Sequence, residues 1–83
     1  MNLPSDATWS ELLAVSAERI RQDKKWGEQN HSDLYWLGIL MEEVGEVAKA
    51  LIENKPDEAQ NELVQVAAVA VSWLECKKRG KQP

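Results

Sequence analysis

Apolar residues recur at helical spacing in three segments of the chain, and the middle segment, from Leu37 to Leu51, shows the pattern most clearly. There they fall on one side of a helix and predict a core-facing stripe. The stripe consists of Leu37, Leu40, Val44, Val47, Ala48 and Leu51. We expect this helix to run from about Asp33 to Glu53, with Ser32 or Asp33 as its N-cap. Pro56 then favours the start of another helix, because proline suits the first helical position.

The first apolar segment follows a capping-box pattern. Thr8 and Glu11 stand three residues apart, and in a capping box such a pair satisfies free amide groups at a helix start. We therefore expect an irregular arm over residues 1–7 and a first helix from Thr8. Its apolar face comprises Leu12, Leu13, Ala17 and Ile20, with Val15 at the margin. Gly27 breaks the helix, and residues 26–31 (WGEQNH) are predicted to form a loop.

The third segment, from Pro56 to Gly80, is ambiguous between strand and helix at its centre. Residues 64–71 are rich in β-branched side chains, but no Gly or Pro occurs between Ala59 and Cys76. This length and the alanine content favour a helix, and Gly80 supplies a C-terminal cap. Nearly every side of the helix is apolar, so we expect burial all round. One edge is more polar and carries Glu58, Glu62, Gln65, Val69, Ser72 and Cys76.

These elements place the chain in the all-α class, as a single domain over residues 1–83. A chain of this size buries only ~60–65% of its unfolded surface. Three helices of this length also cannot surround one of their own number. We therefore predict an antiparallel helical bundle completed by homo-oligomerisation, as a homodimer or a dimer of dimers.

Charge and composition narrow the partners and the compartment. The net charge of −4 disfavours binding to a nucleic-acid backbone or to an anionic membrane. The one cysteine, Cys76, cannot form an internal disulfide and favours a reducing compartment. No secretion signal is visible, and the longest apolar run is too short to span a bilayer. We expect a soluble cytoplasmic protein with no nucleic-acid or membrane partner.

Carboxylates interrupt the apolar repeat of the middle helix. They belong to Glu42, Glu43 and Glu46, and Trp36, Ile39 and Ala50 occupy the same arc of the helix. Apolar neighbours on both sides indicate a pocket wall rather than a fully solvated surface. Trp36 is assigned chiefly to core packing, and Trp9 and Trp73 are assigned to packing alone.

Oxygen-bearing side chains converge if a short turn lays the second and third helices side by side. Counted from the turn, Glu43 and Glu46 are about as far away as Glu62 and Gln65. Hard cations such as Mg²⁺ take oxygen ligands, and the chain has no His or Cys cluster for zinc or iron. In a partly buried site, two carboxylates ~6 Å apart repel by about 3 kcal/mol, which a cation would offset. The alternative is a solvated acidic face, where such repulsion costs little.

The same residues resemble the two-part signature of the MazG-like, all-α nucleoside triphosphate pyrophosphohydrolases. The segment Glu42-Glu43-Val44-Gly45-Glu46 is similar to the family's Glu-Glu-x-x-Glu motif. Glu62-Leu63-Val64-Gln65 is similar to its Glu-x-x-Asp motif, with Gln65 at the aspartate position. The runs KKWGEQNH and EEVGEVAKALIE are also similar to small members of this family. The resemblance covers about Ile20 to Glu75.

The resemblance implies a hydrolase that uses Mg²⁺, with Mn²⁺ as a substitute, to cleave a (d)NTP into a (d)NMP and pyrophosphate. It implies that Glu43, Glu46 and Glu62 bind the metal, with Gln65 as an uncharged ligand. Glu42 is then a further ligand or orients the attacking water. Candidate substrate-binding residues are Arg21, Lys24, Lys25, Trp26, Asn30 and His31. The cations among them also suit the carbonyl end of the first helix. The alternative function is a catalytically weak nucleotide-binding or helical interaction module.

Overall fold

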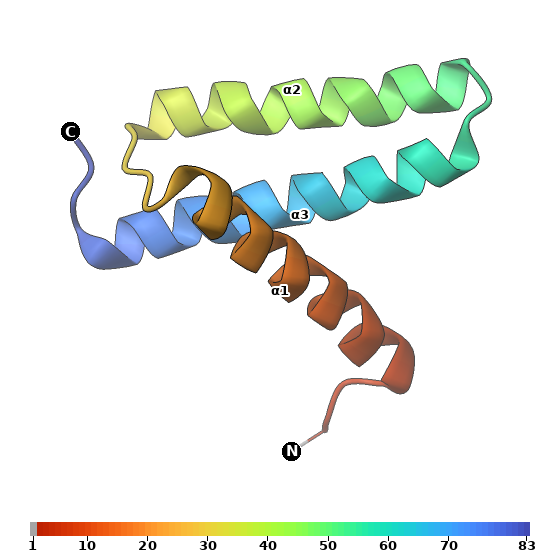
Figure 1. The fold of residues 1–83 in the computed structure, drawn as a ribbon, viewed down its shortest axis with the longest axis horizontal. Coiled ribbons are helices and arrows are strands. Elements are labelled where there is room, and N and C mark those ends of the chain that lie inside the picture. Colours follow the sequence, from red (N-terminus) through yellow and green to blue (C-terminus); the bar gives the residue numbers. More distant parts are fainter. Residues whose placement is uncertain (1) are drawn as a thin grey trace.

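The computed structural model describes residues 2–83, which form three α-helices and contain no strand. α1 spans Asp6–Trp26, α2 spans Asp33–Ile52 and α3 spans Pro56–Arg79. α2 and α3 lie antiparallel and side by side, and α1 crosses α3 at a steep angle (Figure 1). The all-α prediction is confirmed. Within this part of the chain, none of the helices has the length and apolar character needed to cross a membrane.

α1 begins earlier than predicted. Ser5 is its N-cap, and the hydroxyl of Ser5 accepts a hydrogen bond from the amide of Thr8 at 3.1 Å. Asp6 adds a carboxylate to the first turn, which the helix dipole favours. The predicted start at Thr8 is therefore wrong. Ser5 and Thr8 can both act as an N-cap, and a helix that is capped at Ser5 is longer by most of a turn. The arm that precedes α1 shortens to residues 2–5, and Met1 lies outside the described residues.

The other helix ends follow the predicted signals. Ser32 caps α2 by accepting a hydrogen bond from the amide of Tyr35 at 3.3 Å. Pro56 stands in the first turn of α3. Gly27 and Gly80 follow α1 and α3 with φ of 72° and 70°, a region that glycine enters without steric cost.

Loop 27–32 is fastened to the last turns of α3. The guanidinium of Arg79 donates to the carbonyl of Gln29 at 2.8 Å and to the side-chain oxygen of Asn30 at 3.1 Å. Asn30 also accepts a weak bond from the thiol of Cys76 at 3.6 Å. These contacts use the polar groups of the loop within the fold and fix the direction in which α2 leaves it.

Asp33, at the start of α2, is a second anchor to α3. Its carboxylate accepts hydrogen bonds from Gln82 at 2.7 Å, from the indole of Trp73 at 2.8 Å and from Lys77 at 3.1 Å. These donors, Gln82 first, lower the pKa of Asp33 to about 2 because they stabilise its charged form. The register of α2 against α3 is thus fixed at this end of the pair.

The core lies between α2 and α3 and is small. Its buried apolar residues are Trp36, Ala50, Ala59, Ala68, Val69 and Cys76. Among the described residues, Trp36 is the large member of this set, at 2% exposure, and it packs with Val69 and Cys76. The assignment of Trp36 to core packing is confirmed, whereas Trp9 is half exposed, so its assignment to packing is wrong for the chain taken alone.

The predicted core stripe of α2 faces outward. Leu37, Val44, Ala48 and Leu51 are exposed, and Leu40 and Val47 are half-buried. The side that meets α3 instead carries Trp36, Glu43 and Ala50, which are seven residues apart. The prediction of a buried stripe is therefore wrong for the single chain. Periodicity identifies an apolar face, but it does not determine which neighbour covers that face.

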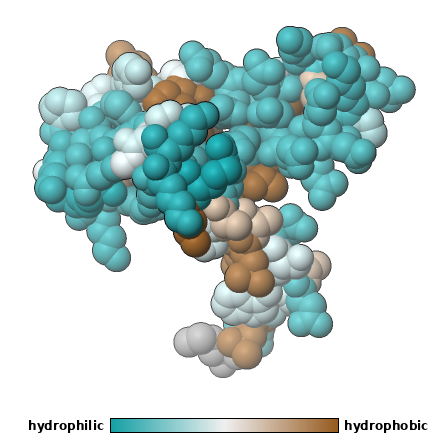
Figure 2. Space-filling view, viewed as in Figure 1, coloured by the Kyte–Doolittle hydropathy of each residue, from teal (hydrophilic) through white to brown (hydrophobic). Residues whose placement is uncertain are grey.

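The apolar faces of α1 and α3 show the same reversal. On α1, Leu12, Leu13, Ala17 and Ile20 are exposed, and Val15 is half-buried. The opposite, polar face of α1 packs against α3, with Gln22 buried there. On α3, Leu63, Val71 and Leu74 are exposed, so the single chain does not bury α3 all round, and the predicted burial with a partner chain stays a prediction. Figure 2 shows the resulting apolar patches along α1.

Candidate functional site

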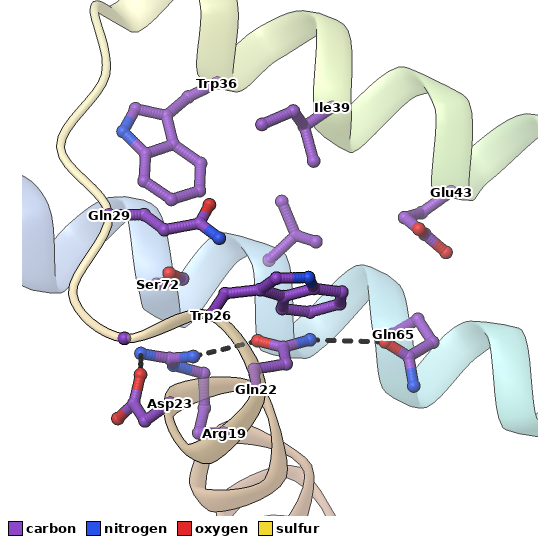
Figure 3. A pocket seen from close by; sticks show the side chains of 12 residues that line it. Arg19, Gln22, Asp23, Trp26, Gln29, Trp36, Ile39, Glu43, Gln65 and Ser72 are labelled. Carbon is purple, nitrogen blue, oxygen red and sulfur yellow. Dashed lines mark hydrogen bonds and ion pairs between the residues drawn. The ribbon is translucent and has the colours of Figure 1, made fainter.

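A cavity of about 190 Å³ lies where α1, α2, α3 and loop 27–32 meet (Figure 3). Its apolar walls are Trp26, Trp36, Ile39 and Val69. Its polar lining consists of Arg19, Gln22, Asp23, Gln29, Glu43, Gln65 and Ser72. Of the pocket wall predicted on α2, Trp36, Ile39 and Glu43 face the cavity, whereas Glu42, Glu46 and Ala50 do not line it. Apolar walls with a few polar groups are typical of a small-molecule site.

A hydrogen-bonded chain of side chains crosses from α1 to α3 along one side of the cavity. Arg19 donates to the amide oxygen of Gln22 at 2.8 Å, and the amide nitrogen of Gln22 donates to Gln65 at 3.2 Å (Figure 3). Arg19 is held in turn by Glu75 at 2.8 Å and by Asp23 at 2.8 Å. Hydrogen bonding to Glu75 raises the pKa of Arg19. Two amide groups are thus held at fixed positions beside the cavity.

Trp26 forms the exposed aromatic side of the cavity. The ammonium of Lys25 lies 4.8 Å from the centre of its ring, and the guanidinium of Arg21 lies 6.0 Å away. Both distances fall within cation–π range, which favours the observed orientation of the indole. Trp26 and the buried Trp36 give the cavity two aromatic walls, which suit a planar ring that also makes hydrogen bonds to nearby amides.

Glu43 faces the cavity from α2 and meets Glu62 of α3. Glu43 is half-buried, and its pKa is raised to about 7. Burial is the largest cause, followed by the hydrogen bond to Glu62 and its charge, and then by the charges of Glu46 and Glu42. At neutral pH the Glu43 carboxyl is therefore partly protonated unless a cation lies beside it.

The other predicted ligands are gathered less closely. Glu46 and Glu62 line a smaller polar cleft toward the turn between α2 and α3. Gln65 lies in the main cavity, bonded to Gln22, and Glu42 is exposed. Over residues 2–83, no group of three or more His, Cys, Asp or Glu side chains is arranged to hold a metal ion. Glu62 therefore lies between the other two predicted ligands. It is near Glu43 at the main cavity and near Glu46 in the smaller cleft.

Five of the six predicted substrate-binding residues lie outside the cavity lining, and Trp26 alone belongs to it. Arg21 pairs with Glu18 at 2.6 Å, an interaction that lowers the pKa of Glu18. Lys24 is exposed, and Lys25 lies over Trp26. The side-chain oxygen of Asn30 accepts hydrogen bonds from Arg79 and Cys76. His31 lies against the tilted ring of Tyr35, with ring centres 4.4 Å apart, and meets Trp36 edge to face, with ring centres 4.9 Å apart.

Sequence reasoning missed Arg19, Gln22 and Gln29 as members of the site. Arg19 and Gln22 are three residues apart on the polar face of α1, which normally points to solvent. Their role follows from the unusual packing of α1 by that polar face. The spacing of these polar residues does not differ from that of a solvent-facing helix side, so the sequence carried no signal for their place in the site.

The raised pKa of Glu43 predicts that the metal-free protein loses stability as pH rises from 5 to 8. Its pKa is 4.5 without the fold's influence and about 7 in the fold, so the folded state binds the extra proton at pH 5 and releases it by pH 8. We expect a loss of about 1 kcal/mol after allowance for solvent screening, or roughly 4–8 °C in Tm. Thermal unfolding monitored by circular dichroism at both pH values, in EDTA, measures it.

Glu43→Gln is expected to abolish this pH dependence, and Glu11→Gln on the exposed side of α1 to retain it. Other carboxyls do not interfere with this measurement. Their pKa values are lowered in the fold, so the stability they contribute is lost at pH values more acidic than the range from 5 to 8. These carboxyls belong to Asp33, Glu18, Glu28 and Glu75. An equal pH dependence in Glu43→Gln and in the wild type would contradict the assignment to Glu43.

No protein-family model, curated protein or solved structure matches the chain. The resemblance to the MazG-like pyrophosphohydrolases therefore stays a hypothesis that rests on the two acidic motifs, residues 42–46 and 62–65.

Proposed function

We propose that this protein is a Mg²⁺-dependent pyrophosphohydrolase that converts a (d)NTP into a (d)NMP and pyrophosphate. The observation that carries the proposal is the Glu43–Glu62 carboxyl pair at the edge of a cavity with two tryptophan walls. Such a pair, half-buried and at neutral pH, requires a proton or a cation to offset its repulsion. The adjoining cavity offers aromatic faces and amides, which suit a nucleobase.

The donor set around Glu43 fits a hard divalent cation. Glu43 and Glu62 offer carboxyl oxygens on facing helices that a bound cation would keep ionised, and Glu46 lies beside Glu62 in the adjoining cleft. Gln65 follows Glu62 by three residues on the same helix and offers an uncharged oxygen. When bound, Mg²⁺ (or Mn²⁺) would supply charge neutralisation for a triphosphate and polarisation of its phosphoryl oxygens.

The remaining work of the site is positioning, because phosphoryl transfer requires little covalent chemistry from the protein. Glu43, Glu46 and Glu62 would hold the cation, and Glu42 would be a further ligand or would orient the attacking water from the exposed side. Trp26 and Trp36 flank the base. Gln22, fixed by Arg19, is held at the cavity edge, where it can hydrogen-bond to the base.

We further propose that the protein acts in the cytoplasm as a homodimer or a dimer of dimers. The small core supports this proposal, since only six apolar side chains of the described chain are buried. A helical chain of this size with so little buried apolar surface gains stability from association. Nucleotides are the expected ligands, whereas the net charge of −4 disfavours nucleic acids and anionic membranes.

The test is an assay of purified protein against a panel of NTPs and dNTPs, with Mg²⁺ and with EDTA, that measures pyrophosphate and the monophosphate. Metal-dependent release of both products from at least one nucleotide is expected. A protein that releases orthophosphate and a diphosphate instead would have a different cleavage site. If no nucleotide is hydrolysed under either condition, the proposed activity is wrong.

Gln65 favours the second candidate function, a catalytically weak nucleotide-binding or helical interaction module. An amide carries no charge, so a metal at this position is held less firmly than by aspartate. If the site is weakened in this way, Gln65→Asp is expected to raise turnover roughly 10-fold or more. The control is Gln65→Asn, which shortens the side chain without adding charge. Strong wild-type turnover that Gln65→Asp leaves unchanged would show that glutamine is adequate there.

A further inference from the structure

Loop 27–32 places one amide side chain in the cavity with a free hydrogen-bond donor. Gln29 lines the cavity, and its side chain extends from the loop toward the space that Trp26 and Trp36 border (Figure 3). The amide oxygen of Gln29 lies 3.2 Å from Nε2 of His31. Its amide nitrogen makes no hydrogen bond within residues 2–83 and is therefore the end of the side chain that a ligand can meet.

Most of the other polar groups in the cavity lining already have protein partners. The pairs are Arg19 with Asp23, Gln22 with Gln65, and Glu43 with Glu62. The exception on the helices is Ser72, which lines the cavity from α3 and is 9% exposed. The hydroxyl of Ser72 forms no hydrogen bond with a side chain of the described part of the chain. Gln29 and Ser72 are therefore the groups left to bind a ligand in the cavity.

The backbone that carries Gln29 is held by Arg79 from the last turn of α3. The guanidinium donates to the carbonyl oxygen of Gln29 at 2.8 Å and to the side-chain oxygen of Asn30 at 3.1 Å and 3.0 Å. Because the donors of a guanidinium form a rigid fork, two adjacent acceptors bound to it keep a fixed spacing. The anchor uses the backbone of Gln29 and not its side chain, so a change of that side chain leaves the loop attached.

A free amide donor beside two indole walls favours a planar ligand with acceptors at its edge. Gln29 is half-buried, and a donor that leaves water without gaining another partner is costly. A nucleobase carries carbonyl oxygens and ring nitrogens at its edge, and proteins bind unpaired bases by stacking their faces and hydrogen-bonding their edges. A site with a fixed donor discriminates against a ligand that has no acceptor at that position.

We propose that Gln29 is the specificity-determining residue of the cavity and that Arg79 is the positioning residue that presents it. This inference rests on the proposed nucleotide function. The amide nitrogen of Gln29 donates to a carbonyl oxygen or ring nitrogen of the base, and the hydroxyl of Ser72 binds a second polar atom of the ligand. The carboxyls that would hold the cation belong to α2 and α3, so loop 27–32 acts on base binding and leaves the cleavage step unchanged.

The test compares Gln29→Met with Gln60→Met, the same change at an exposed position of α3. Methionine keeps the length of the side chain and removes the amide. Gln29→Met is expected to raise KM for the preferred nucleotide about 5–10-fold, the effect of one lost hydrogen bond, and to reduce the preference among bases. The value of kcat and the whole behaviour of Gln60→Met are expected to match the wild type. Wild-type KM and base preference in Gln29→Met, or a fall in kcat alone, would overturn the proposal.

Binding without turnover separates this inference from the proposed activity. Equilibrium dialysis of the four deoxynucleoside monophosphates in EDTA is expected to show an about 5–10-fold higher Kd in Gln29→Met for the monophosphate that binds most tightly. If that difference is found but no triphosphate is hydrolysed, the activity is wrong and base recognition by Gln29 stands. If triphosphates are cleaved but neither KM nor Kd depends on Gln29, the inference is wrong and the activity stands. If none of the nucleotides is bound or cleaved, both proposals are wrong.

A double variant tests the positioning role of Arg79. Arg79→Lys keeps the positive charge but replaces the fork by a single ammonium group, so it is expected to raise KM at least ~3-fold with kcat unchanged. If Arg79 acts through Gln29, adding Arg79→Lys to Gln29→Met is expected to raise KM by less than ~1.5-fold, because the effects of coupled residues do not add. An equal rise in KM with and without the Gln29 amide would show that Arg79 does not position it.

Discussion

Glu43→Gln is expected to reduce Mg²⁺-dependent pyrophosphate release by about 10²–10³-fold, the usual cost of removing one group that stabilises the charge of a transition state. Glu43 faces the cavity, and its carboxyl meets that of Glu62. Glutamine keeps the shape of the side chain but removes the charge that would hold the cation. The loss is measured as kcat/KM for the best nucleotide in the panel, at saturating Mg²⁺.

The matched control is Glu11→Gln, the same chemical change at an exposed position of α1. It is expected to keep wild-type activity within a factor of about two. Glu43→Gln is expected to fold normally, because the amide resembles the protonated carboxyl that the fold favours up to a pH of about 7. If Glu43→Gln retained full activity, the carboxyl pair would have no part in the reaction, and the proposed site would be wrong.

Trp36→Ala is expected to lower the free energy of unfolding by about 3–5 kcal/mol, because it leaves a large void in a small core. Trp36 is 2% exposed and packs with Val69 and Cys76, which are the other members of that cluster. A domain of this kind is stable by only ~5–15 kcal/mol, so this one change would remove a large share. Urea unfolding at a fixed protein concentration measures the loss.

Trp26→Ala serves as the comparison for Trp36→Ala. Trp26 is 53% exposed, so its removal is expected to cost under ~1 kcal/mol of stability while it weakens nucleotide binding. Trp36→Phe, which keeps most of the apolar volume, is expected to lie between wild type and Trp36→Ala. Equal stability losses for Trp26→Ala and Trp36→Ala would mean that the core is not centred on Trp36.

The helices and the central acid pair could be predicted from the sequence because short-range signals determine them. Ser32, Pro56 and Gly80 mark helix ends through local hydrogen bonding and allowed backbone angles, and they act in the same way in any fold. Glu43 and Glu62 meet because a short turn between two helices fixes which residues lie opposite one another. The start of α1 was missed since Ser5 and Thr8 carry equivalent local signals.

The direction of packing could not be predicted in the same way. The apolar stripes of α1 and α2 were expected to face the core of the chain, but Leu13 and Val44 are exposed. A stripe shows that a face needs apolar cover, yet the cover can come from the same chain or from another. For the same reason Arg19 and Gln22 were not recognised in the cavity, because they lie on a polar helix face that turned inward.

The polar attachment of α1 to α3 has a consequence for access to the cavity. The contacts that join the two helices, such as Arg19 with Glu75 and Gln22 with Gln65, are hydrogen bonds and ion pairs that water can replace at modest cost. Gly27 follows α1 directly and has no side chain to resist rotation of the backbone. A swing of α1 about Gly27 would therefore separate the amides of Gln22 and Gln65 while the α2–α3 pair stays intact.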